Sequence, residues 1–105
     1  YDPEVEEPNR NALLAGTYGG KLANGQPISV RLDYPTGLQL TWGTKPNTSS
    51  GFWFRNDSLL TLQLVNADGK LGGLLLMHFD GANLVAVEWD EKVFGKPGIP
   101  LGKVP

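Results

Sequence analysis

Apolar and polar residues alternate along most of this chain, which is the pattern of strands that bury one face. In the segment 27–34 (PISVRLDY), every second residue is apolar and the residues between are mostly polar. Similar segments predict further strands over residues 17–22, 38–44, 51–55, 59–65, 71–79 and 84–89. The polar stretch 45–51 (KPNTSSG) predicts a loop between two of them.

Short turns separate these segments and recur about every 8 to 12 residues, as in all-β sandwiches and barrels. The turn signals include Asn24-Gly25, Pro35-Thr36-Gly37 and Asp68-Gly69. Because each connection is short enough for a hairpin, neighbouring strands are expected to pair antiparallel. The sequence therefore predicts an all-β fold, a small antiparallel up-and-down β-barrel or coiled β-sandwich of seven to eight strands.

The two ends of the chain differ from this pattern. Residues 1–11 begin with the acidic, proline-flanked sequence YDPEVEEP and predict a flexible arm or linker. Residues 9–15 can form one short helical turn with Asn9 as its N-cap. The barrel domain is expected over residues 12–105, with a proline- and glycine-rich tail from residue 90. This tail is predicted to lie over the sheet and to end in an edge strand.

Two predicted strands are apolar on both faces, which a simple barrel wall does not require. These are 74–79 (LLLMHF) and 84–89 (LVAVEW). Either the tail covers their outer face or a partner does, because exposed apolar patches mark interaction sites. A homodimer through the region Leu74–Trp89 is one form that such a partner can take.

Length, charge and residue composition exclude several classes of function. The 105 residues are enough for one domain, carry a net charge of −2 and include no cysteine. The nine basic residues are scattered, so no nucleic-acid surface is expected. No apolar run reaches the length of a membrane span and no signal peptide opens the chain. Since the chain begins at Tyr1, we expect processing, and an upstream lipid anchor is the one route to a membrane.

Catalytic and metal-binding groups are sparse. His78 is the only histidine and no Gly-x-Ser-x-Gly motif is present, so neither a triad nor a zinc site is expected. Carboxylates near the sheet are expected to face solvent. We predict no enzyme activity, no metal and no cofactor. Asn47 and Asn56 begin N-glycosylation sequons that are equally typical of turns.

Aromatic residues suggest where a ligand would bind. In the segment 51–55 (GFWFR), Phe52 and Phe54 alternate with Trp53 and Arg55. If the two phenylalanines fill the core, Trp53 lies outside beside Arg55, as a flat ring and a forked donor for a sugar or peptide. Coverage of Trp53 by the tail or by loop 45–51 is the alternative. Trp42 and Tyr18 are the expected walls of the pocket.

The sequence LAGTYGGKL over residues 14–22 is similar to the opening of small lipocalin-like (calycin-type) β-barrels, including domains of bacterial envelope lipoproteins. Gly16 and Tyr18 occupy the positions of the Gly-x-aromatic motif in those families. The chain lacks the lipocalin tryptophan at position 18 and the Cys-x-x-Cys of copper-related envelope lipoproteins. The resemblance implies an extracytoplasmic location, in the periplasm, on the outer membrane or secreted, and a non-catalytic role.

Together these observations predict a non-catalytic extracytoplasmic binding module. Its ligand would be a glycan, a small amphipathic molecule or a partner protein. The alternative is a protein inhibitor of a hydrolase that presents a loop such as 94–101 (FGKPGIPL).

Overall fold

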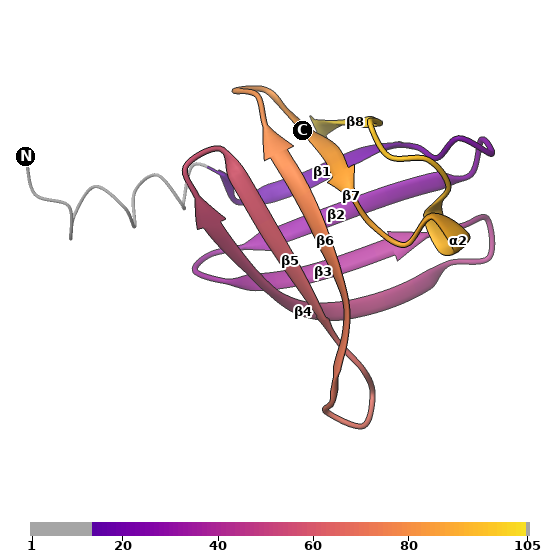
Figure 1. Ribbon diagram of the computed structural model, residues 1–105, viewed down its shortest axis with the longest axis horizontal. Helices are drawn as coiled ribbons and strands as arrows, with labels where there is room; N and C mark the ends of the chain where they lie inside the picture. Colours follow the sequence, from indigo (N-terminus) through magenta and orange to yellow (C-terminus); the bar gives the residue numbers. More distant parts are fainter. Residues whose placement is uncertain (1–13, 105) are drawn as a thin grey trace, which may run out of the picture.

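Eight antiparallel strands close into a barrel in the computed structural model, which describes residues 14–104 (Figure 1). The strands are β1 (Gly16–Lys21), β2 (Pro27–Asp33), β3 (Gly37–Trp42), β4 (Asn47–Asn56), β5 (Leu59–Val65), β6 (Leu71–Phe79), β7 (Asn83–Glu88) and β8 (Pro100–Val104). Each strand pairs with its neighbours in the chain, and β8 closes the barrel against β1. The predicted antiparallel up-and-down barrel is confirmed.

Alternation along the strands fills the barrel with apolar side chains. An eight-stranded barrel has an interior just wide enough for such a filling. These core side chains are at most 6 % exposed: Leu14, Tyr18, Leu22, Ile28, Val30, Leu32, Leu38, Leu40, Trp53, Leu60, Leu62, Leu75, Met77, Leu84, Ala86, Trp89, Phe94 and Leu101. Side chains therefore occupy the space in which a wider barrel holds a ligand.

A short helix, α2 (Glu91–Phe94), closes one end of the barrel (Figure 1). It begins at Asp90, whose carboxylate accepts a hydrogen bond from the backbone N–H of Lys92 at 3.0 Å. Phe94 packs on Trp42 edge to face, with ring centroids 5.2 Å apart, and on Trp89 at 5.1 Å. The indole N–H of Trp89 donates to the carbonyl oxygen of Gly95 at 2.8 Å. The rings of Trp42, Trp89 and Phe94 thus pack together at this end of the barrel, and we call them the aromatic plug.

At the opposite end of the barrel, two buried aromatic side chains donate hydrogen bonds to backbone carbonyl oxygens. The Tyr18 hydroxyl donates to the carbonyl oxygen of Leu14 at 2.8 Å. The indole N–H of Trp53 donates to the carbonyl oxygen of Asp33 at 2.9 Å. Because buried donors without a partner are costly, both rings are fixed in place by these bonds.

Two predictions about the strands need correction. The segment 45–51 is not all loop, since β4 begins at Asn47 and its first residues pair with β3. The tail does form a strand, β8, but it is not an edge strand because it pairs with both β1 and β7. The predicted acidic arm 1–11 lies outside the described residues, and so does most of the predicted helical turn 9–15.

Candidate functional site

Trp53 does not face solvent as the proposed ligand site requires. Its side chain is 1 % exposed, whereas Phe52 and Phe54 are 48 % and 55 % exposed. The alternation of β4 therefore has the opposite orientation to the one on which that site depends: the tryptophan enters the core and the phenylalanines lie outside. Trp53 stabilises the barrel and is not available to a ligand in this structure.

The other three predicted site residues lie apart from one another. Tyr18 is inside the barrel, bonded to Leu14. Arg55 is half-buried at the end of β4, where its Nε donates to the carbonyl oxygen of Asp57 at 2.7 Å. Trp42 is half-buried at the opposite end, beside Phe94 of the aromatic plug. The structure thus does not bring the four residues together, although Trp42 does line a surface cleft.

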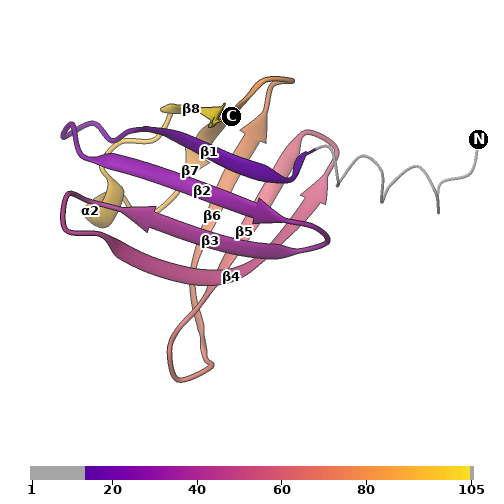
Figure 2. The ribbon, with the colours of Figure 1, turned by 180° about the vertical axis from the view of Figure 1, so that it is seen from behind.

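The outside of the barrel has a polar half and an apolar half. On β1–β3, which lie side by side in Figure 2, the outward side chains are polar, and Arg31 forms an ion pair with Asp33 at 3.1 Å. On β4–β7 the outward side chains include several exposed apolar ones. Phe52, Phe54, Leu59, Leu74 and Val87 are each between 37 % and 56 % exposed. The tail leaves Leu74 and Val87 exposed, so of the two alternatives for the outer face of residues 74–79 and 84–89 the structure does not show coverage by the tail.

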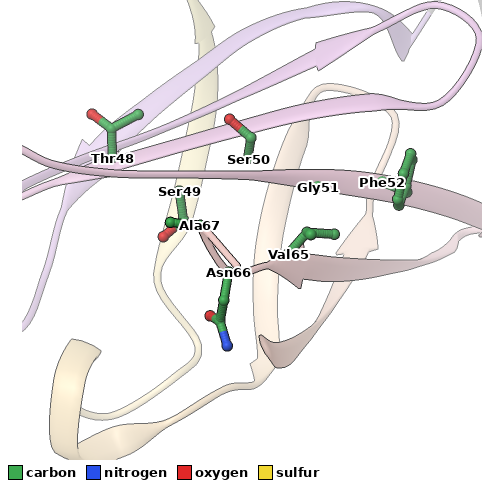
Figure 3. Close-up of a pocket in the computed structure, with 8 residues that line it drawn as sticks. All are labelled: Thr48, Ser49, Ser50, Gly51, Phe52, Val65, Asn66 and Ala67. Carbon is green, nitrogen blue, oxygen red and sulfur yellow. The ribbon is translucent and has the colours of Figure 1, made fainter. Parts of the chain in front are cut away.

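A groove of about 540 Å³ separates the first half of β4 from the β5–β6 hairpin (Figure 3). Thr48, Ser50 and Phe52 contribute its β4 wall, and Val65 and Asn66 belong to the opposite side. The groove exists because β4 pairs with β5 only from Ser50 onward. It is wide and open, and its walls carry hydroxyl and amide groups with one aromatic ring.

On the other side of this hairpin, β6 extends beyond its neighbour β7. The pairing of these strands begins at Leu76, opposite Glu88. Leu71, Leu74 and Leu75 pair with β5 along one edge, and no described strand pairs with residues 71–75 along the other. We call this segment the β6 overhang. In Figure 1 the β5–β6 hairpin reaches below the rest of the barrel.

Apolar clefts flank the β6 overhang where it separates from β7. One, of about 170 Å³, is lined by Trp42, Leu75, Val93 and Phe94 together with Leu74. The other, of about 380 Å³, is lined by Leu74, Leu76, Glu88, Trp89 and Asp90 with Gly73. Both clefts share Gly73, Leu74 and Asp90, so they meet at the free edge of the strand. Trp42 and the apolar region Leu74–Trp89 were both selected from the sequence, but a free strand edge and clefts there were not predicted.

The β6 overhang lacks the usual protection of an open strand edge. Natural edges are blunted by charged residues, by proline or by a covering segment. Leu71–Leu75 contains neither charge nor proline. Its one irregularity is a bulge against β5, where Gln63 Nε2 donates to the carbonyl oxygens of Leu64 at 2.9 Å and Gly72 at 3.1 Å. That bulge lies on the paired side and leaves the other edge accessible.

Ionisable groups of the described residues form no cluster that could hold a metal ion. Among residues 14–104, no group of three or more His, Asp or Glu side chains is placed to hold a metal ion. The carboxylate of Asp80 accepts from the backbone N–H groups of Asn83 and Ala82, which lower its pKa, so it stabilises the β6–β7 turn. His78 is exposed on the outer face of β6. No helix in this range is long and apolar enough to cross a membrane.

Tyr18 gives a pH dependence that can be measured. Burial raises its pKa above the ordinary value of 10.0, because the phenolate is poorly solvated in the barrel. This group's contribution to stability is complete below pH 10 and is lost as the pH rises through the raised folded pKa. We expect the free energy of unfolding to fall more steeply above pH 10 in the wild type than in Tyr18→Phe. Urea titrations at several alkaline pH values test this, and parallel pH profiles would contradict it.

Comparisons with known proteins identify no relative. No family model matches the chain, and neither a curated protein nor a solved structure does. The geometry of the β6 overhang and its clefts is therefore the basis for its function.

Proposed function

We propose that this chain is a non-catalytic, extracytoplasmic protein-binding module, and that it binds an extended segment of its partner as an additional strand along the β6 overhang. The extracytoplasmic location follows from the lipocalin-like resemblance of residues 14–22, which also remains a proposal. The observation that carries the binding mode is the free edge of Leu71–Leu75. Strand addition to such an edge is a common mode of peptide recognition.

The free edge of the β6 overhang offers an added strand both backbone hydrogen-bonding groups and apolar clefts. The backbone N–H and C=O groups that face away from β5 would bond to the added strand, and each such bond contributes about 0.5–1.5 kcal/mol. The apolar clefts on the two sides of Leu74 would accept alternate side chains of the added strand. Glu88 and Asp90 line one of these clefts. We therefore expect the partner segment to be apolar with a basic residue at one end.

The other functions considered from the sequence have less support. The segment 94–101 is held at both ends by buried Phe94 and Leu101. Between them, the N–H of Gly98 donates to Ala86 at 2.7 Å, and the N–H of Ala86 donates to Ile99 at 3.2 Å. Because this segment lies along β7, it is not presented to an enzyme as the loop of a hydrolase inhibitor would be. The filled interior likewise does not favour a small ligand held inside the barrel.

A synthetic hexapeptide of one lysine followed by alternating valine and threonine tests strand addition. We expect it to shift the backbone amide NMR signals of Leu71–Leu76 and Glu88 and to bind with measurable affinity. Leu74→Lys should weaken this binding at least tenfold, about 1.4 kcal/mol, because it places a charge where the two clefts meet. Binding is measured by titration of the isotopically labelled protein.

The matched control is Val104→Lys, which makes the same kind of change at an exposed apolar residue of β8. It should bind the hexapeptide as the wild type does. A second hexapeptide with N-methylated backbone amides should not bind. Equal affinity for both peptides, or an unchanged affinity in Leu74→Lys, would count against strand addition at β6.

A further inference from the structure

We infer that the partner is a second copy of this chain: two β6 overhangs pair antiparallel across a two-fold axis at Gly73, and Lys70 of each copy meets Glu88 of the partner subunit. This inference rests on the proposed function, because it names the strand that is added. The chain's own segment 70–76 (KLGGLLL) has the chemistry expected of that strand, since it is extended and apolar and follows a lysine.

The two-fold axis determines which residues meet. In an antiparallel pair of identical strands centred on Gly73, Gly72 lies opposite Leu74 and Leu71 lies opposite Leu75 of the other copy. The overhang of one copy then matches the overhang of the other in length, because both run from Leu71 to Leu75. The pairing ends where β7 begins its own pairing with β6, opposite Leu76.

Gly73 lies in the bulge between β5 and β6, where glycine is common, but no contact within a single copy excludes a larger side chain there. A Cβ at this position would meet no atom within 4 Å, and its φ is not in the left-handed region. Glycine weakens a strand, and within strands it often marks the close approach of another backbone. Here the other backbone would be that of the second copy, at the axis where the two strands cross.

Charges at the two ends of the paired strands are complementary. Lys70 immediately precedes the overhang and is exposed. In the proposed register Leu71 is the last residue of the added strand to pair, opposite Leu75 of the other copy. Glu88 of that copy occupies the position opposite Leu76, so Lys70 comes beside Glu88 where the added strand meets the end of β7. Glu88 is exposed at the end of β7. Each copy therefore places one lysine beside one glutamate of the other, and the symmetry makes two such pairs.

The pairing also covers exposed apolar side chains. Leu71 is the most exposed of the large apolar residues at 71 %, and Leu74 is 56 % exposed. Both lie on the overhang, and Leu71 would come opposite Leu75 of the other copy, beside the cleft of Trp42 and Phe94. The contact is shorter than a standard interface of about 1,600 Å². We therefore expect a reversible dimer with a dissociation constant in the micromolar range.

Sedimentation equilibrium over low-micromolar to near-millimolar concentrations tests the inference. The wild-type mass should rise from 11.4 kDa towards twice that value. Lys70→Glu and Glu88→Lys should each weaken association at least tenfold, because each places like charges together. The double variant Lys70→Glu/Glu88→Lys should restore it. Lys21→Glu, a charge reversal on β1, serves as the control and should associate as the wild type does.

Circular dichroism confirms that every variant is folded. Each outcome then supports or contradicts the proposed dimer. A monomer at all concentrations that still binds the lysine-valine-threonine hexapeptide at β6 overturns the second copy as partner and leaves the proposed function intact. A monomer that binds no hexapeptide overturns both. A dimer that is unaffected by the single charge reversals, or not restored by the double one, overturns this register.

Discussion

Replacing Trp53 by alanine is expected to lower the free energy of unfolding by about 3–5 kcal/mol. The indole is one of the largest fully buried side chains, and its removal leaves a cavity in the barrel core. The change also removes the hydrogen bond to the carbonyl oxygen of Asp33. Urea denaturation followed by far-ultraviolet circular dichroism measures this loss without depending on tryptophan fluorescence.

The neighbouring residue provides the control. Phe54→Ala removes a ring of similar chemistry from the outer face, where it is more than half exposed. Its cost should stay below about 1 kcal/mol. Trp53→Phe keeps most of the volume and loses the donor, so it should cost about 0.5–1.5 kcal/mol, the net value of one hydrogen bond. If the alanine variants at 53 and 54 lost equal stability, the orientation of β4 described here would be wrong.

The orientation of β4 was the main error of the sequence-based reasoning, and its cause is physical. A shift of one residue exchanges the two faces of a strand, so the three aromatic residues 52–54 fit either orientation. Arg55 favoured the wrong one, because a charged residue on the same face as Trp53 indicates solvent. In the structure Arg55 lies near the end of the barrel, where its half-buried side chain reaches a turn carbonyl.

Strands with alternating apolar residues were predicted close to their observed bounds. For β5 and β6 the predicted ranges 59–65 and 71–79 equal those observed. The first half of β4 was missed because residues 47–50 are all polar and give no hydrophobic period. These residues form a strand through their hairpin ladder with β3, a pairing that hydrophobic periodicity does not indicate.

The sequence contains an indication of the β6 overhang, but the overhang was not predicted from it. The predicted strands 71–79 and 84–89 already differed in length by three residues, so one had to extend past the other. Which end remains free depends on the turn at Asp80–Asn83 and on the bulge in the β6–β7 ladder. Neither follows from periodicity. The apolar outer face of β6 and β7 was recognised from the sequence, and the structure leaves it exposed.

The close pairing of β4 with β5 depends on Gly51, and Gly51→Ala is expected to cost about 3 kcal/mol in the free energy of unfolding. An alanine Cβ would overlap the backbone carbonyl oxygen of Gln63 and lie 2.9 Å from the Cα of Leu64. Neither atom belongs to a flexible side chain, so the backbones of β4 and β5 would have to separate. Their ladder from Ser50 to Asn56, which includes the buried Trp53, would be distorted. Urea denaturation measures the loss of stability.

Gly73→Ala is the matched control at protein concentrations well below those at which the proposed dimer forms, because within a single copy its added methyl group meets no other atom within 4 Å. The same substitution should there be neutral or stabilise by about 0.4–1 kcal/mol, since alanine restricts the unfolded chain more than glycine does. Amide hydrogen exchange separates the two effects further. Gly51→Ala should lose protection along β4 and β5, whereas Gly73→Ala should keep it. Equal stabilities of the two variants would show that β4 and β5 do not approach as closely at Gly51 as the barrel requires.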